Sequence, residues 1–237
     1  MSERLDKYMV DKELVKTRSQ ARMLIKQGDV YCNDFQVLKP GKLVSDTDVI
    51  KIKSDSIYVS RGAYKLLRAI EAFDLDFSGK VVADCGASTG GFTQVALQSG
   101  AAKVFAIDVG HDQLDEVLKQ DTRVINFEGI NLKNNFILPE PVDICVADLS
   151  FISIKKVYPT IKKLLTPQGY SIILIKPQFE AGRERLGKGG IVKAEHQETI
   201  LEEVLAWFRE NSFMVEKVCE SPIKGKTGNQ EYLALIR

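Results

Sequence analysis

Short apolar runs alternate with longer segments of mixed polarity along the chain after residue 79. Apolar runs of about four to eight residues are typical of strands buried on both faces of a sheet. The clearest helical segment covers residues 196–211, around Trp207. This alternation predicts an α/β domain with a parallel sheet and helices on both faces. The predicted strands cover residues 80–84, 103–108, 124–126, 142–148, 170–175, 213–220 and 232–236.

The first 60 residues follow another pattern. Residues 17–28 predict a helix: Thr17 and Gln20 have the spacing of a capping box, and Gly28 suits the left-handed residue after the last turn. An apolar stripe on this helix is formed by Ala21, Leu24 and Ile25. Short strands are predicted at residues 29–32, 35–38 and 49–52, with a turn at Pro40 and Gly41. We therefore predict two helices and then a small curled sheet.

The change of pattern predicts two domains, residues 1–57 and 58–237, connected near residues 54–58. A chain of 237 residues with 44% hydrophobic residues is long enough for a core in each. Its 33 basic and 32 acidic residues nearly cancel, but the first 60 residues hold 11 basic against 9 acidic ones.

The local excess of base lies on the predicted helix. Arg18, Arg22 and Lys26 fall at i, i+4 and i+8, so they line one flank and would follow a phosphate backbone. A solvated basic face is the alternative.

Cysteine and histidine usage predicts no metal site, because the four cysteines form no Cys-x-x-Cys pair and the two histidines lie far from them. The chain begins with charged residues, and no apolar stretch approaches the ~18 residues of a membrane-spanning helix. We expect a protein of the reducing cytoplasm, without a membrane partner.

Residues 3–53 resemble the S-four-type RNA-binding domain, the α-L motif of a ribosomal protein, pseudouridine synthases and some tRNA synthetases. The resemblance rests on Arg4-Leu5-Asp6, Arg18-Ser19-Gln20-Ala21-Arg22, Ile25, Gly28-Asp29-Val30, Asn33 and Asp48-Val49-Ile50. It implies a small α+β domain that binds RNA. The candidate contacts in it are Arg4, Arg18, Arg22 and Lys26.

The first long strand ends in a glycine-rich turn, residues 84–92, whose glycines allow a sharp bend and a close approach to a ligand. Asp108 closes the next strand, where an acid would accept both ribose hydroxyls of an adenosyl group. Together they favour S-adenosylmethionine, although Asp84 as a helix cap and Asp108 as a polar strand end are alternatives. The adenine contact is left open between Glu128 and Asn131. The predicted cofactor-binding residues are Asp84, Gly86, Ser88, Gly90, Gly91, Phe92, Asp108 and Asn131.

Four charged residues carry the candidate chemistry: Lys65, Asp148, Lys176 and Glu231, called the tetrad below. Asp148 and Lys176 each close an apolar strand, and strand ends are where doubly wound sheets place their ligands. Taken alone, Lys65 has the pattern of a solvated residue, because Arg61 and Arg68 share its helix flank.

The motifs around the tetrad are Val-Ser-Arg-Gly-Ala-Tyr-Lys-Leu, Ala-Asp-Leu-Ser-Phe-Ile-Ser, Leu-Ile-Lys-Pro-Gln-Phe-Glu and Gly-Asn-Gln-Glu-Tyr-Leu. Through them, residues 58–237 resemble the ribosomal RNA ribose 2′-O-methyltransferases of the TlyA or haemolysin A family. In that family an S-four-type domain precedes an FtsJ-like domain with a Rossmann-like class I methyltransferase sheet. Ala63 departs from the family, which often has glycine there.

This resemblance implies a methyltransferase that uses S-adenosylmethionine to methylate a ribose in ribosomal RNA, with a cytidine suggested, on naked RNA or a ribosomal subunit. It implies that the tetrad is catalytic. Lys176 is the candidate base, since burial and the nearby Lys65 favour its neutral form, whereas Asp148 and Glu231 oppose that form. The balance stays open. The alternatives are a non-catalytic RNA-binding assembly factor, a cytolysin and a small-molecule methyltransferase.

Residues 181–193 combine four cations with four glycines, which predicts a flexible basic loop that closes over RNA, or else a disordered surface loop. Further RNA contacts are predicted from Arg61, Arg183 and Arg185.

Overall fold

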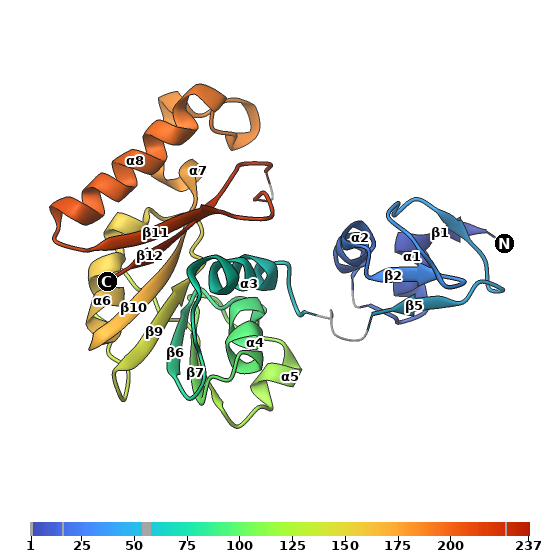
Figure 1. Ribbon diagram of the computed structural model, residues 1–237, viewed down its shortest axis with the longest axis horizontal. Coiled ribbons are helices and arrows are strands. Elements are labelled where there is room, and N and C mark those ends of the chain that lie inside the picture. Colours follow the sequence, from blue (N-terminus) through green and yellow to red (C-terminus); the bar gives the residue numbers. More distant parts are fainter. Residues whose placement is uncertain (1, 16, 54–57, 226) are drawn as a thin grey trace. The chain divides into compact units, whose positions relative to one another are not determined.

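A computed structural model describes residues 2–15, 17–53, 58–225 and 227–237. These residues form two compact units, Met1–Arg61 and Gly62–Arg237. The connection predicted near residues 54–58 lies largely outside the described residues. Figure 1 shows a small unit of short elements and a larger one built around a sheet.

The first unit contains two helices and short strands, as predicted. Its elements are β1 (Glu3–Arg4), α1 (Leu5–Asp11), α2 (Arg18–Gln27), β2 (Val30–Cys32), β3 (Phe35–Gln36), β4 (Leu43–Val44) and β5 (Ile50–Ile52). The three predicted strands pair in the order β3-β2-β5, and the short β1–β4 pair was not predicted. The fully buried residues Leu5, Met9, Leu24, Ile25 and Val30 form its core.

Helix α2 begins and ends as its sequence predicts. The Thr17 hydroxyl accepts a hydrogen bond from the Gln20 backbone N–H at 3.2 Å, and Gly28 has a φ of 84°. The Gln20 side-chain amide donates to the Tyr58 carbonyl at 3.4 Å.

The second unit is built on a seven-stranded sheet with the order β11-β12-β10-β9-β6-β7-β8. Its strands are β6 (Val81–Cys85), β7 (Lys103–Ile107), β8 (Val124–Phe127), β9 (Val142–Ala147), β10 (Leu165–Ile175), β11 (Val215–Glu220) and β12 (Tyr232–Ile236). The prediction of a parallel sheet is wrong at one edge, since β12 runs antiparallel to both β10 and β11. The reason is that β11 and β12 are joined as a hairpin and not by a crossover, so the chain reverses direction between them.

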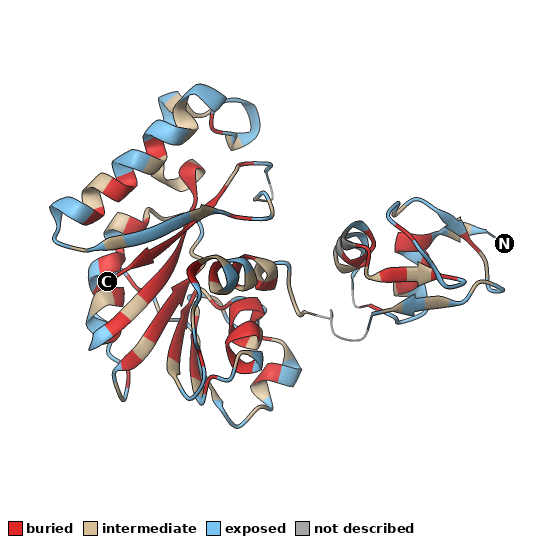
Figure 2. Ribbon diagram, viewed as in Figure 1, coloured by how far each residue is buried: buried red, intermediate tan, exposed pale blue. Residues whose placement is uncertain are grey.

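Helices cover both faces of this sheet, as predicted (Figure 1). The helices are α3 (Gly62–Phe73), α4 (Gly91–Gln98), α5 (Glu116–Lys119), α6 (Tyr158–Leu164), α7 (Pro177–Glu180) and α8 (Ala194–Glu210). One core joins α6 and α8 to the sheet through Tyr158, Ile161 and Phe208. Figure 2 shows the buried central strands between exposed helix surfaces.

Strand pairing explains why distant residues meet at one edge of the sheet. Cys85 of β6 pairs with Ala147 of β9, so the turn after β6 begins beside Asp148. In the antiparallel pair, Ile175 of β10 lies opposite Tyr232 of β12. Because β12 runs antiparallel to β10, Glu231, which directly precedes β12, lies beside the carboxyl end of β10.

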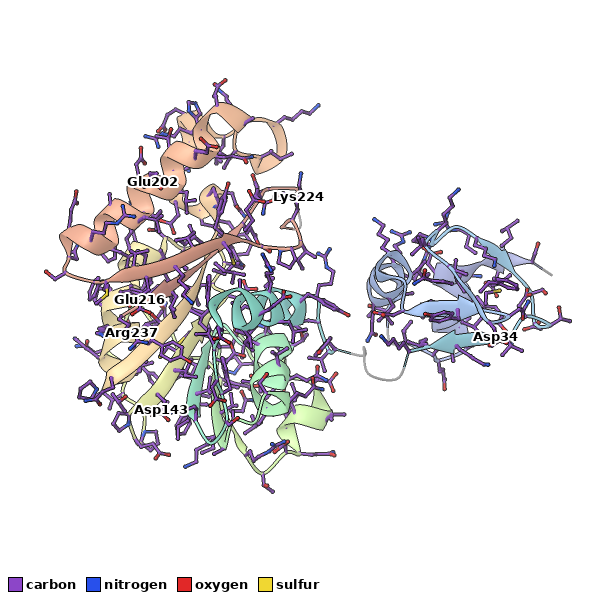
Figure 3. The ribbon with its side chains drawn as sticks, viewed as in Figure 1. Asp34, Asp143, Glu202, Glu216, Lys224 and Arg237 are labelled. Atoms are coloured by element: carbon purple, nitrogen blue, oxygen red, sulfur yellow. The ribbon has the colours of Figure 1, made fainter. Side chains whose placement is uncertain are left out.

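An ion pair joins β11 to the residue after β12, at the open end of the β11–β12 hairpin. Arg237 follows β12, and its Nε lies 2.7 Å from Oε1 of Glu216 in β11 (Figure 3). The same arginine lies over the Tyr170 ring of β10, 5.6 Å from its centroid. These contacts link Arg237 to β11 and β10 at the end of β12 opposite Glu231.

Candidate active site

The structure brings all four members of the tetrad into one chain of ion pairs. Lys176 Nζ lies 2.5 Å from Asp148 Oδ1, and Lys65 Nζ lies 3.3 Å from Asp148 Oδ2. Lys65 Nζ also lies 2.7 Å from Glu231 Oε2. Each carboxylate oxygen of Asp148 thus pairs with a different lysine, and Asp148 lies between the two cations.

Burial makes this pairing necessary. The side chains of Lys65, Lys176 and Glu231 are 10%, 8% and 3% exposed. Lys65 is therefore not the solvated residue that the pattern of its helix alone indicates. Two cations and two anions balance each other, which limits the cost of removing them from water.

Electrostatics keep Asp148 ionised. Burial alone would raise the pKa of its carboxyl group, but Lys176 and Lys65 outweigh burial and hold that pKa below its ordinary value. Asp148 is therefore an anion over the whole neutral range, able to stabilise an ammonium on either lysine.

Two neighbours that the sequence did not single out complete the hydrogen bonds of the tetrad. Lys176 Nζ donates to Ser150 Oγ at 2.8 Å, and Gln178 Nε2 donates to Glu231 Oε1 at 3.1 Å. Ser150 lies two residues after Asp148, and Gln178 lies two residues after Lys176. This spacing was the sequence signal that could have identified them.

The glycine-rich turn lies directly beside the tetrad. Gly86 has a φ of 88°, and a Cβ there would come within 2.8 Å of the Asp148 carbonyl oxygen. Gly90, with a φ of 94°, precedes Gly91, the first residue of α4. Only glycine therefore allows the turn to pass this close to β9.

Asp108 organises the same turn. Its Oδ2 accepts from the Ser88 backbone N–H and its Oδ1 from that of Gly110, both at 2.8 Å. A carboxylate has about four acceptor positions, so capacity remains for hydroxyl donors. Asp108 is half-buried and directly follows β7, so its carboxylate oxygens remain available as acceptors for two hydroxyl groups, as the predicted ribose contact requires.

Asp84 lies beneath the turn. It is fully buried, and its Oδ2 accepts from Thr93 Oγ1 at 2.7 Å, while Oδ1 has no partner among the described residues. Burial raises the pKa of Asp84 to about 7. The geometry shows Asp84 fixing α4 beneath the turn through Thr93, and the predicted cofactor contact stays a prediction.

The remaining cofactor candidates differ in exposure. Phe92 is buried in α4, whereas Asn131 is exposed and its Oδ1 accepts from the Lys133 backbone N–H at 3.0 Å. Glu128 accepts from Asn126 Nδ2 at 2.9 Å and is half-buried. The choice between Glu128 and Asn131 remains open.

In the first unit, the predicted basic stripe is partly an ion-pair cluster. Arg4 Nε, Arg18 Nη2 and Arg22 Nε lie 3.0, 3.1 and 2.7 Å from the carboxylate of Asp6, which is fully buried. The three arginines remain about half exposed and hold the pKa of Asp6, which burial would raise, far below its usual range. Lys26 is exposed and has no ion pair among the described residues.

The segment predicted as a flexible loop is organised. Leu186 and Val192 form an antiparallel bridge, and Val192 is buried. Buried Asn229 accepts from the Val192 N–H at 2.8 Å and donates to the Gly190 carbonyl, which ties the segment to the strand that Glu231 precedes. These contacts join positions about 40 residues apart, which no local pattern reveals, and closure of the segment over RNA stays a prediction.

The predicted RNA contacts outside the first unit's helices, Arg61, Arg183 and Arg185, differ in exposure. Arg61 and Arg183 are exposed, while the Arg185 guanidinium is bound by both Glu203 oxygens at 2.7 Å. Among the described residues, no helix is long and apolar enough to cross a membrane.

Two parts of the chain match two different protein families. Residues 3–50 match the S4 domain, and residues 58–237 match the FtsJ-like methyltransferase family. Hemolysin A of Brachyspira hyodysenteriae is 40% identical over 98% of this chain and 98% of its own. The Mycobacterium tuberculosis protein named 16S/23S rRNA (cytidine-2'-O)-methyltransferase TlyA is 40% identical over 99% of this chain and 89% of its own.

A solved structure from Streptococcus thermophilus, which carries a provisional hemolysin name, superposes with a TM-score of 0.74. It is 39% identical and covers 99% of this chain and 88% of its own. The similarity therefore extends over both units.

Proposed function

The chain belongs to the FtsJ-like methyltransferase family, and on that premise we propose that it methylates a ribose 2′-hydroxyl of ribosomal RNA with S-adenosylmethionine. The observation that carries the proposal is the buried tetrad beside the glycine-rich turn. The relative from Mycobacterium tuberculosis is named for cytidine 2'-O-methylation, and we propose the same class of target here.

The cofactor would be held by the turn after β6 and by Asp108, whose carboxylate keeps free acceptor capacity for the ribose hydroxyls. When bound, S-adenosylmethionine supplies a methyl group on a sulfonium leaving group, which leaves as a neutral thioether. The protein then has two tasks, which are to align the 2′-oxygen with that carbon and to remove its proton.

Lys176 is the proposed base. In its neutral form it would accept the 2′-hydroxyl proton at Nζ, and Asp148 Oδ1, 2.5 Å away, would stabilise the ammonium that forms. Lys65 bridges Asp148 and Glu231, so its proposed role is to hold both carboxylates in place and to orient the hydroxyl.

The first domain, residues 1–57, is proposed to bind the RNA and to deliver it to the second, residues 58–237. The S4 match and the half-exposed arginines around Asp6 support this division. A ribosomal substrate also supports a cytoplasmic location.

The direct test is to incubate the purified protein with methyl-labelled S-adenosylmethionine and, separately, naked ribosomal RNA, each ribosomal subunit and whole ribosomes. Nuclease digestion followed by mass spectrometry would locate the label. We expect 2′-O-methylcytidine in at least one substrate. Label on a base, or no transfer to any of the substrates, would overturn the proposal.

A further inference from the structure

A cavity of about 550 Å³ lies at the carboxyl edge of the sheet, next to the tetrad. Its lining includes Lys133, Phe151, Lys156, Gln178, Phe179 and Arg183. Pockets of about 300–1,000 Å³ are the usual size for small ligands and ligand groups. The lining comes from the segments that follow β8, β9 and β10, whereas the glycine-rich turn follows β6.

The lining is strongly cationic. Lys133, Lys156 and Arg183 are all exposed, and none has an ion pair among the described residues. The described lining contains no carboxylate. Two acids flank the lining in sequence: Glu184 follows Arg183, and Glu180 follows Phe179. The two Glu180 oxygens accept from Ser153 Oγ at 2.6 Å and from the Ile154 N–H at 2.7 Å, so that carboxylate is already hydrogen-bonded at the cavity wall.

The cavity contacts the tetrad through two of its lining residues. Gln178 donates to Glu231, and its Oε1 is buried without a partner among the described residues. The Phe179 ring lies 5.8 Å from Lys176 Nζ. A group bound in the cavity would therefore be separated from the proposed base, Lys176, by the Phe179 ring.

Backbone strain marks the same place. Phe151 has a φ of 62°, is 92% exposed, and lies against Phe179 with ring centroids 5.2 Å apart. A positive φ is strained for a non-glycine residue, and such strain gathers at binding sites and active sites. The protein thus keeps an exposed aromatic residue in the cavity wall at an energetic cost.

We propose that this cavity is an RNA phosphate subsite, in which Lys133, Lys156 and Arg183 hold a backbone phosphate next to the nucleotide whose ribose is methylated. Three cations without an ion pair among the described residues suit a phosphodiester, and they share the cavity with Phe179, which lies against Lys176, so they would bind the RNA next to the proposed base. The inference rests on the proposed function. It assigns Lys133 and Lys156 to substrate binding, which the sequence motifs do not.

The test uses the full chain and the double variant Lys133→Ala/Lys156→Ala. Its matched control, Lys80→Ala/Arg209→Ala, removes the same charge outside the cavity. Fluorescence anisotropy with a single-stranded 12-nucleotide RNA over a salt series measures phosphate contacts directly. We expect the slope of log affinity against log salt to fall by about 1.4 in the double variant, from about 0.7 for each lost contact, and to stay unchanged in the control.

Kinetics provide a second reading on the ribosomal substrate that accepts the methyl group. We expect the double variant to raise the RNA KM about tenfold while kcat at saturating RNA stays within about twofold, as expected for lost substrate binding. The cofactor KM should stay constant. Thermal unfolding checks the fold, and Lys133→Gln/Lys156→Gln replaces the alanine pair if that pair is unstable.

The outcomes separate this inference from the proposed function. A wild-type salt slope and RNA KM in the double variant would overturn the subsite while leaving the methyltransferase proposal intact. If the wild-type protein methylates no ribosomal RNA, the proposed function fails, and the anisotropy slope still decides whether the cavity binds phosphate.

Discussion

At the residue scale, the tetrad links catalysis to electrostatics. Lys176→Ala removes the proposed base, and methyl transfer should fall by a factor of about 10² or more while cofactor affinity barely changes. Asp148 keeps Lys65 as a partner, so the fold should survive. Initial rates with labelled cofactor measure the effect, and the control is Lys163→Ala, an exposed lysine of α6. Near-wild-type activity in Lys176→Ala would show that another group takes the proton.

Lys65→Ala tests whether the tetrad acts as a unit. Its loss leaves Glu231 without its buried cation, so the rate should fall as well. The double change with Lys176 should be far less than additive, because residues that act together share one effect. Rates of the two single variants and the double variant form the required cycle. Strictly additive losses would indicate independent roles.

Asp84 gives a pH prediction. Its folded-state pKa, raised by burial to about 7, exceeds the unfolded value of 3.8, so the folded state holds its proton to higher pH. This group therefore makes stability fall as the pH rises from about 4 to about 7. Asp84→Asn keeps an acceptor for Thr93 and should flatten that decline. Thermal unfolding of both proteins from pH 4 to pH 8 measures it, and parallel curves would contradict the raised pKa.

At the element scale, the sequence predicts where strands lie better than how they run. Period and apolar content located all the strands of the large sheet, and β12 was placed at its observed bounds. The direction of β12 depends on the hairpin that joins it to β11, and apolar pattern carries no direction. Likewise, the contacts that order residues 181–193 come from Asn229, a partner that no local pattern reveals.

The turn after β6 supplies the element-scale prediction. Gly86→Ala combines left-handed strain with a contact at 2.8 Å to the Asp148 carbonyl oxygen, so it should displace both the turn and Asp148. The matched control is Gly79→Ala, which has a φ of 70° and nothing within 4 Å of the added Cβ. Strain alone should cost about 1–2 kcal/mol in either variant.

Only Gly86→Ala should also weaken cofactor binding, at least tenfold, and lower the transfer rate. Isothermal calorimetry with S-adenosylmethionine and chemical denaturation separate the two effects. Equal losses of stability with unchanged cofactor affinity would show that the turn has room for a side chain after all.

At the scale of the whole molecule, the two units divide the predicted work. The tetrad and the glycine-rich turn lie within Gly62–Arg237, and the arginine cluster around Asp6 lies within Met1–Arg61. The sequence identified those arginines as RNA contacts, but not their shared carboxylate, because Asp6 is 12 and 16 residues from Arg18 and Arg22. Their structural and RNA-binding roles therefore need separate variants.

Removing residues 1–57 should leave cofactor affinity unchanged and weaken RNA binding, with a smaller salt slope. Within the full chain, Lys26→Ala should reduce that slope by about 0.7 on single-stranded RNA without changing the melting temperature, because Lys26 is exposed and has no ion pair among the described residues. Arg22→Ala should reduce the slope and also lower stability by about 1–3 kcal/mol, because it removes a 2.7 Å bond to the buried Asp6. Filter binding over a salt series and thermal unfolding measure the two effects on the same samples. If Arg22→Ala lost stability but kept the full salt slope, the cluster would serve only to hold the first unit together, and RNA affinity would have to come from Lys26 and the cavity cations.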